Sequence, residues 1–369
     1  MYVVYLDNEL MSFNDTNASV CDSTGKLVLY SNGCYIETPY GAVVANSTGL
    51  NLGLMADLFC ANNNGLGQYN RANSMMIIPH PDHKSLYGLF HIRTLNSFHQ
   101  KDVLHTMVDM SANDGKGSTV FKNVPIIDDS ISYNGLHAVR HANGRDWWIV
   151  AQKYLINRYH FALFSPDGFS NHHQDIGTKE TQIGIWGAEL AFSPDGSKLA
   201  RFDGRHGLDV FDFDRCSGTL SNWRHAFFPG HTIESLAGLG WSADSRYLYA
   251  SNNLVVRQID TWSDDLQASA VVVAEAVFPS PSCGNADGSL GWMELGPDGI
   301  LYSRPYNGQP CVHRIKHAER AGLACDYQQD YLVLEYPIRA FPHFPNFRLG
   351  PIDGSACDTL GIDNVPLAG

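Results

Sequence analysis

Hydrophobic and polar residues alternate along short stretches of this chain, and one arrangement of them recurs. An apolar, alternating segment is followed by a turn of Pro, Asp, Asn and Gly, and then by a second segment containing Leu, Tyr, Phe or Trp. Alternation with a period of two predicts a half-buried β-strand, and the turn residues predict a hairpin. Six such hairpins are predicted, and they begin near Ala18, Met76, Leu136, Leu190, Leu239 and Met293.

Further strands are predicted behind several hairpins, at 208–214 and 254–260 as third strands and at 270–277 as a fourth. The hairpins recur every ~50 to 60 residues, which suits a four-stranded propeller blade with modest loops. A two-layer sandwich also contains many short strands, but it would not explain one recurring hairpin pattern. We therefore predict an all-β fold, a seven-bladed β-propeller of four-stranded antiparallel blades, with six blades as the alternative.

The two ends of the chain are predicted to close the ring. Residues 347–352 (FRLGPI) resemble an inner strand, and residues 2–6 (YVVYL) could pair beside it, which would leave no open sheet edge. No linker divides the array, since the longest irregular stretches, 51–73 and 318–329, are better explained as insertions on one rim. Residues 1–369 are accordingly predicted to form a single β-propeller domain.

Composition narrows the range of partners. Hydrophobic residues make up 44% of the 369 residues, which is enough for a packed interior. Because 25 Lys and Arg residues stand against 38 Asp and Glu residues, the net charge is -13, which repels phosphate backbones and anionic membranes. We expect no nucleic-acid partner and, since no apolar stretch approaches the ~18 residues that span a bilayer, no membrane insertion. Only 17% of residues are charged, which suits a secreted protein.

The eight cysteines are spread along the chain without a C-x-x-C motif or a His at zinc-finger spacing, so a metal cluster of that kind is not expected. An even number of cysteines allows disulfides in an oxidising compartment. Free thiols buried as small hydrophobic groups are an equal alternative, because free Cys is among the most buried residue types. The sequence does not predict which cysteines pair.

Five stretches carry a resemblance to a known family: TNASVCDSTGKLVLYSNGCYI (16–36), AVRHANGRDWWIV (138–150), FSPDGSKLARFD (192–203), LDVFDFDRCSGTLSN (208–222) and FRLGPIDGSACDTLG (347–361). The chain resembles the secreted WD40/YVTN-like β-propellers of Bacteroidota that are exported by the type IX secretion system. The resemblance implies a seven-bladed fold and an extracellular or cell-surface location, but no defined activity. Similar proteins carry signal and sorting segments, and neither pattern is found here, so the resemblance implies a trimmed propeller domain or an atypical member.

The densest group of chemically versatile residues lies at 140–148. It combines guanidinium, imidazole, carboxylate and indole groups, which suit recognition of carboxylates or sugars. The candidate ligand-binding residues are Arg140, His141, Arg145, Asp146 and Trp147. The alternative is structural: Asn143-Gly144 is a common hairpin turn, the carboxylate would pair with an arginine across that turn, and the tryptophans would pack between blades.

A second group could hold a metal. The segment IIPHPDHK and the strand that returns from it supply His80, Asp82 and His91, which could bind a divalent metal such as calcium. The alternative is a hydrogen-bonded turn capped by Asp82. Aromatic residues near predicted loops, including Tyr35 and Trp223, could be recognition platforms or wedges buried between blades.

No familiar catalytic motif is present: there is no G-x-S-x-G, H-E-x-x-H, P-loop or G-x-G-x-x-G. The sequence therefore predicts an extracellular, non-catalytic binding module that contacts a protein or a carbohydrate at its rim. The alternative is a propeller hydrolase or lyase with a His/Arg or metal site in the central channel, since propeller enzymes gather residues from several blades. A quinoprotein-like oxidoreductase shares only the architecture. Neither the ligand nor the oligomeric state is predicted.

Overall fold

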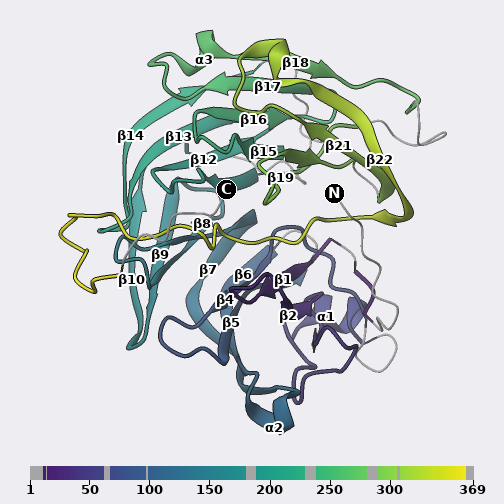
Figure 1. Cartoon of the computed structure of the whole chain (residues 1–369), viewed down its shortest axis with the longest axis vertical. Helices are drawn as coiled ribbons and strands as arrows, with labels where there is room; N and C mark the ends of the chain where they lie inside the picture. Colours follow the sequence, from purple (N-terminus) through teal and green to yellow (C-terminus); the bar gives the residue numbers. More distant parts are fainter. Residues whose placement is uncertain are drawn as a thin grey trace. The chain divides into compact units, whose positions relative to one another are not determined.

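The structure is a computed structural model that describes residues 11–13, 15–61, 67–96, 99–179, 188–228, 238–280, 289–305 and 308–362. The chain is an all-β propeller protein built from antiparallel sheets (Figure 1). It divides into two compact units. Unit 1 contains Met1–Ile131, Phe164–Phe169 and Pro342–Pro345, and unit 2 contains Ser132–Leu163, Ser170–Phe341 and Asn346–Gly369. The prediction of a single domain over the whole chain stays a prediction.

Unit 1 begins with a three-stranded sheet of β1 (Ala18–Cys21), β2 (Leu27–Ser31) and β3 (Ile36–Glu37). Helix α1 (Leu54–Phe59) follows, and then β4 (Met75–Pro79), β5 (Leu86–Asn96), β6 (His99–Asp109), the short helix α2 (Ala112–Gly115) and β7 (Ser118–Arg140). Strand β7 pairs with β6 and continues into unit 2, so the sheet order is β10-β9-β8-β7-β6-β5-β4. Within the described ranges, no helix is long and apolar enough to cross a membrane.

Unit 2 contains the end of β7, β8 (Trp147–Lys153) and most of β9 (Arg158–Ser165) and β10 (Gly168–Asp175). Three four-stranded sheets follow. The first has β11 (Ala188–Phe192), β12 (Lys198–Asp203), β13 (Gly207–Asp214) and β14 (Thr219–Ala226). The second has β15 (Gly238–Trp241), β16 (Tyr247–Ser251), β17 (Val255–Asp260) and, after α3 (Leu266–Ser269), β18 (Val271–Glu275). The third has β19 (Met293–Leu295), β20 (Leu301–Ser303), β21 (Gln309–Ile315) and, after η1 (Gly322–Cys325), β22 (Tyr327–Ile338).

The six predicted hairpins are confirmed, as β1–β2, β4–β5, β7–β8, β11–β12, β15–β16 and β19–β20. The predicted third strands at 208–214 and 254–260 correspond to β13 and β17, and the predicted fourth strand at 270–277 contains β18. Among the first strands of these three sheets, β11 contacts β15, and β15 contacts β19, which lies beside it in Figure 1. This is the blade arrangement that the recurring hairpin pattern predicts.

The core of unit 2 consists of apolar layers between successive sheets. Phe202 of the β11–β14 sheet shares one layer with Trp241 and Leu248 of the β15–β18 sheet. In the next layer, Tyr249 and Leu301 join the β15–β18 and β19–β22 sheets. One such sheet alone would expose both faces, and burying apolar surface contributes about 25 cal/mol per Å². Each sheet is therefore stabilised mainly by its neighbours.

The predicted closure at the C-terminal end is wrong in one respect: residues 347–352 do not form a strand. Pro351 has no backbone N–H to donate to a sheet. The segment is held by other contacts, because Arg140 Nη2 donates to the carbonyl oxygen of Phe347 at 3.3 Å and the N–H of Ile352 donates to the carbonyl oxygen of Ala142 at 2.9 Å. The predicted partner strand at 2–6 lies outside the described residues, and the count of seven blades stays a prediction.

Both alternatives for the cysteines occur together. Disulfides join Cys34 to Cys60 and Cys216 to Cys357, and Cys311 is also disulfide-bonded. Two of the cysteines that the structure describes are free thiols, the exposed Cys21 and the buried Cys325. The Cys216–Cys357 bond spans 141 residues and fastens the C-terminal segment to the turn between β13 and β14.

Removing the Cys216–Cys357 disulfide, by changing both cysteines to serine, is expected to lower the free energy of unfolding of unit 2 by about 3 kcal/mol, because the bond restricts the unfolded chain. All 7 Trp residues belong to unit 2, so urea unfolding followed by Trp fluorescence reports this unit. Cys21→Ser, which removes an exposed free thiol of unit 1, is the control and should leave the midpoint unchanged. An unchanged midpoint in the double variant would contradict the prediction.

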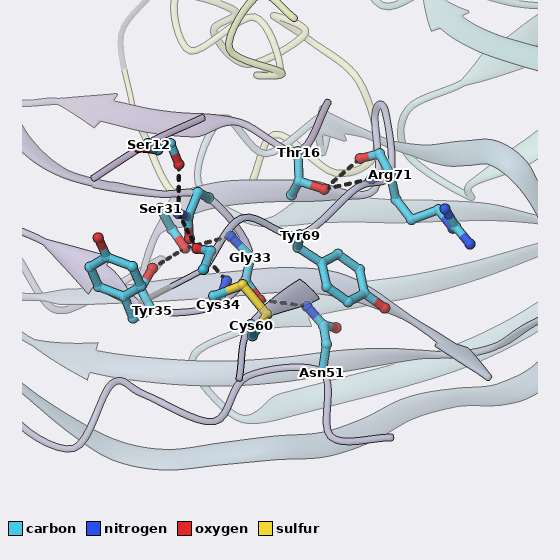
Figure 2. Close-up of a disulfide and its surroundings, with 12 residues drawn as sticks. Ser12, Thr16, Ser31, Gly33, Cys34, Tyr35, Asn51, Cys60, Tyr69 and Arg71 are labelled. Atoms are coloured by element: carbon cyan, nitrogen blue, oxygen red, sulfur yellow. Dashed lines mark hydrogen bonds between the residues drawn. A yellow bond between two sulfur atoms is a disulfide. The ribbon is translucent and has the colours of Figure 1, made fainter. Parts of the chain in front are cut away.

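The other described disulfide organises the loop after β2. Figure 2 shows Cys34–Cys60 among Gly33, Asn51 and Tyr69. Asn51 Nδ2 donates to the carbonyl oxygen of Gly33 at 3.0 Å. Gly33 has a φ of +85°, and a Cβ there would lie 2.8 Å from the Cβ of Tyr69. Only glycine fits this position, both in conformation and in space.

Candidate functional site

The five residues predicted to bind a ligand lie together on the hairpin between β7 and β8. Their polar groups are engaged by the hairpin itself, by the turn between β13 and β14 and by the C-terminal segment. Arg145 Nε donates to Asp146 Oδ1 at 2.7 Å, and Arg140 Nη1 donates to the carbonyl oxygen of Gly144 at 2.9 Å. His141 Nε2 lies 3.0 Å from the carbonyl oxygen of Cys216. These contacts match the structural alternative that the sequence left open.

The same hairpin holds the C-terminal segment. The guanidinium of Arg140 lies 4.2 Å from the centre of the Trp147 ring, and burial lowers the pKa of Arg140 to about 10. Trp147 is buried and makes an edge-to-face contact with Phe347 at 5.8 Å between ring centres. The structure thus gives these residues an anchoring role. A ligand-binding role for them stays a prediction.

The structure does not bring the three predicted metal ligands together. His80 and Asp82 share the turn after β4, where the N–H of Asp82 donates to His80 Nδ1 at 3.1 Å. His91 pairs with Met75 at the other end of the β4–β5 hairpin, about 13 Å away along the strand at ~3.3 Å per residue. In the described part of the chain, no group of three or more His, Cys, Asp or Glu side chains is arranged to hold a metal ion.

His91 instead has a structural role. It is fully buried, its Nδ1 lies 2.7 Å from Asn51 Oδ1, and its Nε2 lies 3.0 Å from Thr106 Oγ1. Burial, and to a lesser degree His105, lower the pKa of His91 to about 3. The imidazole is therefore neutral, and its hydrogen bonds join the loop before α1 to β6.

His105, on β6, is a second buried imidazole of unit 1. It stacks on Phe90 at 4.9 Å and meets Phe121, Phe164 and Phe169 edge-on. Burial lowers its pKa to about 3. An unfolded histidine has a pKa of about 6.5, so between these values the unfolded state binds the extra proton. The neutral imidazole therefore stabilises unit 1 above about pH 6.5, and this contribution is lost as the pH falls toward 3.

Replacing His105 with phenylalanine should make unit 1 less sensitive to acid, because a phenylalanine fits among the aromatic rings and takes up no proton. Between pH 6 and pH 5 the variant is expected to lose about 1 kcal/mol less stability than the wild type. The measurement is hydrogen exchange of the β5 and β6 amides at both pH values. The exposed His83→Asn is the control, and an equal pH dependence in wild type and His105→Phe would contradict the prediction.

A different group of charged side chains lies on one face of the β11–β14 sheet, and we call it the Arg201 cluster. Its members are Gln152, Thr178, Arg201, Asp203, His206, Asp209, Trp223 and His225. Arg201 on β12 pairs with Asp209 on β13, and Asp209 pairs with His225 on β14. Directly opposed residues on adjacent strands place their side chains on the same face. Three neighbouring strands thus deliver an arginine, an aspartate and a histidine to one place.

Arg201 is the charged centre of the cluster. Its side chain is only 1% exposed, its Nε donates to Gln152 Oε1 at 2.9 Å, and it forms an ion pair with Asp203. Asp203 also lies 3.0 Å from His206 Nδ1. Burial acts to raise the pKa of Asp203, but the Arg201 charge and the hydrogen bonds from His206 outweigh it and hold the pKa well below its usual range. The carboxylate therefore stays ionised although it is buried.

Asp209 is the second buried carboxylate. It accepts hydrogen bonds from His225 Nδ1 at 2.9 Å, from Trp223 Nε1 at 2.8 Å and from the Thr178 hydroxyl at 2.8 Å. Burial acts to raise its pKa, but the bond from His225 and the charge of Arg201 outweigh this and lower the pKa. Asp209 is thus an ionised acceptor that orients an imidazole, an indole and a hydroxyl.

His225 has the most exposed side chain among the titratable members of the cluster. Its side chain is 32% exposed, and no hydrogen bond engages its Nε2 within the described part of the chain. Because the Asp209 carboxylate can only accept at Nδ1, the proton of the neutral ring lies on Nδ1 and the lone pair on Nε2. An oriented imidazole with an accessible Nε2 can take a proton from water.

Trp223 provides an apolar surface beside this imidazole. Its ring centre lies 6.3 Å from that of His225, and 46% of the residue is exposed although its Nε1 is tied to Asp209. The sequence had singled out Trp223 as a platform or a wedge, but it missed Asp209 and His225. The signal that could have found them is Asp209 itself, an aspartate inside the apolar run LDVF. A carboxylate buried in such a strand predicts a hydrogen-bonding partner on the adjoining strand.

No protein-family model and no curated protein matches the chain. Solved structures do. A candidate 6-phosphogluconolactonase from Bacteroides uniformis is 15% identical with a TM-score of 0.49, covering 87% of this chain and 86% of that one. A gluconolactonase from Xanthomonas campestris is 15% identical with a TM-score of 0.39, covering 83% and 86%. The periplasmic gluconolactonase of Pseudomonas aeruginosa is 15% identical with a TM-score of 0.40, covering 70% and 69%.

These findings correct the predicted function. The non-catalytic binding module is contradicted, because the similar structures bear the names of lactonase enzymes, which agrees with the alternative of a propeller hydrolase. They also support the propeller part of the resemblance, and they do not extend to the Bacteroidota family or to type IX export. At these identities and TM-scores, substrates and sites remain those of the other proteins, so a function for this chain has to rest on its own residues.

Proposed function

We propose that the chain is a hydrolase in which His225, oriented by Asp209, is the general base that activates water. The observation that carries the proposal is a buried, ionised carboxylate paired at 2.9 Å with a partly exposed imidazole. Such a pair fixes the tautomer of the ring and stabilises the imidazolium that forms when the ring takes up a proton. The site lies on the outer strands β13 and β14, whereas the sequence alternative placed it in a central channel.

The reaction needs three steps at these atoms. His225 Nε2 takes a proton from a water molecule while the water oxygen bonds to the carbonyl carbon of the substrate, giving a tetrahedral oxyanion. The oxyanion re-forms the carbonyl and breaks the bond to the alkoxide leaving group. The imidazolium returns its proton to that alkoxide. Asp209 remains ionised throughout, because its low pKa keeps the proton on the imidazole.

Carboxylic esters, including cyclic esters, are the substrate class that this arrangement suits best. Hydrolysis of an ester needs a water molecule, a base that activates it and a proton that is returned to the alkoxide leaving group. The His225–Asp209 pair supplies the base and returns the proton. Trp223 offers a fixed aromatic face on which the non-reacting part of a substrate can pack. Arg201 is too deeply buried to contact substrate, and it acts by holding the two aspartates ionised.

The test is hydrolysis of 4-nitrophenyl acetate and of an unsubstituted δ-lactone by the full chain, followed by absorbance and by titration of released acid. The wild type should exceed the buffer rate, and His225→Gln should fall to that rate. His173→Gln on β10, an exposed histidine outside the cluster, is the matched control and should keep full activity. Equal rates in wild type and His225→Gln on both substrates would overturn the proposal.

We further propose that the protein folds in an oxidising compartment, in line with the extracellular location expected from the sequence. Its support is the pairing of Cys34 with Cys60 and of Cys216 with Cys357, since disulfides persist in secreted proteins and are rare in the cytosol. Counting free thiols in the purified protein tests this compartment. Reduced Cys216 and Cys357 in protein taken from its native location would overturn the proposal of an oxidising compartment.

Seven blades remain the blade count that we propose, because the hairpin spacing supports it.

A further inference from the structure

Trp262 is the most exposed tryptophan that the structure describes. It lies in the turn between β17 and α3, residues 260–265, which we call the Trp262 turn. The residue is 64% exposed, whereas Trp223 is 46% exposed and the other described tryptophans are buried. An indole is large and apolar, and most of its surface is usually buried. Trp262 instead presents an apolar ring to solvent.

The indole is nevertheless held in place by a stacked cation. The guanidinium carbon of Arg246 lies 4.8 Å from the centre of the Trp262 ring and 4.9 Å from the centre of the Tyr247 ring. Arg246 is itself fixed, because its Nη2 forms an ion pair with Asp260 Oδ2 at 2.7 Å and its Nε lies 3.2 Å from both carboxylate oxygens. One face of the indole is thus covered, and the exposed surface belongs to the opposite face and the ring edges.

The backbone on both sides of Trp262 is also held by hydrogen bonds. The N–H of Trp262 donates to Asp260 Oδ1 at 3.1 Å. From β14 of the neighbouring sheet, Arg224 Nη1 donates to the carbonyl oxygens of Thr261 at 2.8 Å and of Ser263 at 2.9 Å. A side chain that is already ordered loses little conformational freedom when a ligand binds. The Trp262 turn is therefore preorganised for contact through its indole.

The Trp262 turn lies against the opposite face of the β11–β14 sheet from the Arg201 cluster. Trp223 and His225 both donate to Asp209 within that cluster. Successive side chains of a strand point to opposite faces, so Arg224, which holds the Trp262 turn, points away from the cluster. The Trp262 turn and the proposed hydrolase site are therefore separate, and each can be tested without the other.

The charges around the ring indicate the class of ligand that fits it. Arg246 places a positive charge against the covered face, which weakens the attraction of a second cation to the open face. Asp264 and Asp265 follow Trp262 in the same turn and are exposed, so an anion is repelled. Carboxylates also accept hydrogen bonds from hydroxyl groups. An uncharged ligand with an apolar face and several hydroxyl groups satisfies all of these conditions.

We propose that Trp262 is the platform of a carbohydrate-binding site, in addition to the hydrolase site. A pyranose ring presents C–H groups on one face and hydroxyl groups around its edge. The C–H groups would pack on the open face of the indole and bury apolar surface, and the exposed Asp264 carboxylate would accept hydrogen bonds from the hydroxyl groups. In this proposal, the carbohydrate that the sequence predicts at the rim binds at one specific side chain.

Fluorine NMR of the full chain labelled with fluorotryptophan tests the proposal. The probes are neutral hexamers of β-linked glucose, α-linked glucose, mannose and N-acetylglucosamine, and the signal that is missing in Trp262→Ala identifies the indole. At least one probe should shift that signal in the wild type. Calorimetry should show that this probe binds at least about tenfold more weakly to Trp262→Ala. Tyr336→Ala on β22 removes an aromatic residue that is 62% exposed, and this matched control should bind like the wild type.

A second variant tests the support under the ring. Arg246→Lys keeps the positive charge but loses the planar guanidinium, so it should weaken binding of the same probe by about threefold. Charged hexamers of glucosamine and of galacturonic acid should bind more weakly than the neutral probe. Any one of three results would overturn the proposal: no shift of the Trp262 signal with any neutral probe, equal binding by Trp262→Ala and the wild type, or tighter binding of a phenylalanine-containing tripeptide or a charged hexamer than of every neutral probe.

Discussion

Replacing Arg201 with methionine is expected to lower the free energy of unfolding of unit 2 by about 3 to 5 kcal/mol. Methionine fills a similar volume, but it leaves Asp203 and Asp209 buried without a compensating positive charge, and removing one partner of a buried ion pair has a cost of this size. The measurement is urea unfolding at pH 7 followed by Trp fluorescence. A change below about 1 kcal/mol would show that the two aspartates do not depend on Arg201.

An arginine at the surface supplies the control. Arg320 is 58% exposed and lies 3.6 Å from Glu319, so Arg320→Ala should change stability by less than about 0.5 kcal/mol.

The pH dependence of the stability of unit 2 gives an independent check on the role of Arg201. The folded pKa of Asp203 and of Asp209 lies below the unfolded value of about 3.9, so their contribution is present above that pH and is lost as the pH falls below it. In Arg201→Met, this acid-labile contribution should be missing.

His225→Gln and Asp209→Asn are each expected to lower kcat/KM for ester hydrolysis by about 10² to 10⁴. The first change removes the base, and the second leaves the base without the carboxylate that fixes its tautomer and stabilises its charged form. Because the two residues act as one unit, the double variant should be no slower than the slower single variant. Initial rates with 4-nitrophenyl acetate over a range of concentrations supply the numbers.

The division between kcat and KM distinguishes chemistry from binding in this site. The two dyad variants should lose kcat with little change in KM, whereas Trp223→Ala should raise KM and retain most of kcat, since the indole only packs against the substrate. Additive losses in the double variant would indicate two independent roles. Full activity in Asp209→Asn would show that the carboxylate does not assist His225.

The hairpins could be predicted because each depends on residues close in sequence. In LAFSPDGSKLARFD, the alternation of apolar residues and the Pro-Asp-Gly turn together determine both strands, which the structure confirms as β11 and β12. The structure of the C-terminal segment was harder to predict from the sequence. FRLGPI has the apolar pattern of a strand, but its position is determined by distant contacts, including the hydrogen bond from Arg140 to Phe347, that no local pattern reveals.

The candidate site depends on pairing between strands. Asp209 and His225 are opposed across β13 and β14, and a bulge between Val210 and Asp212 shifts the register of these strands on one side of them. The sequence does not reveal this register, so it could not predict which residue of β14 lies opposite Asp209. At 140–148, side chains that are close in sequence bond to one another and to the Cys216 and Phe347 carbonyl oxygens, and a ligand-binding role for them stays a prediction. His80 and His91 were close in sequence but lie at opposite ends of one hairpin.

The Cys216–Cys357 bond has a consequence for protease resistance. It closes a loop of 141 residues that contains β15 to β22, two complete sheets of unit 2. A single cut anywhere in that loop leaves both fragments covalently joined, so a nicked molecule should migrate as one band on a denaturing gel until a reducing agent separates it. A protein exposed to extracellular proteases would keep its severed sheets attached.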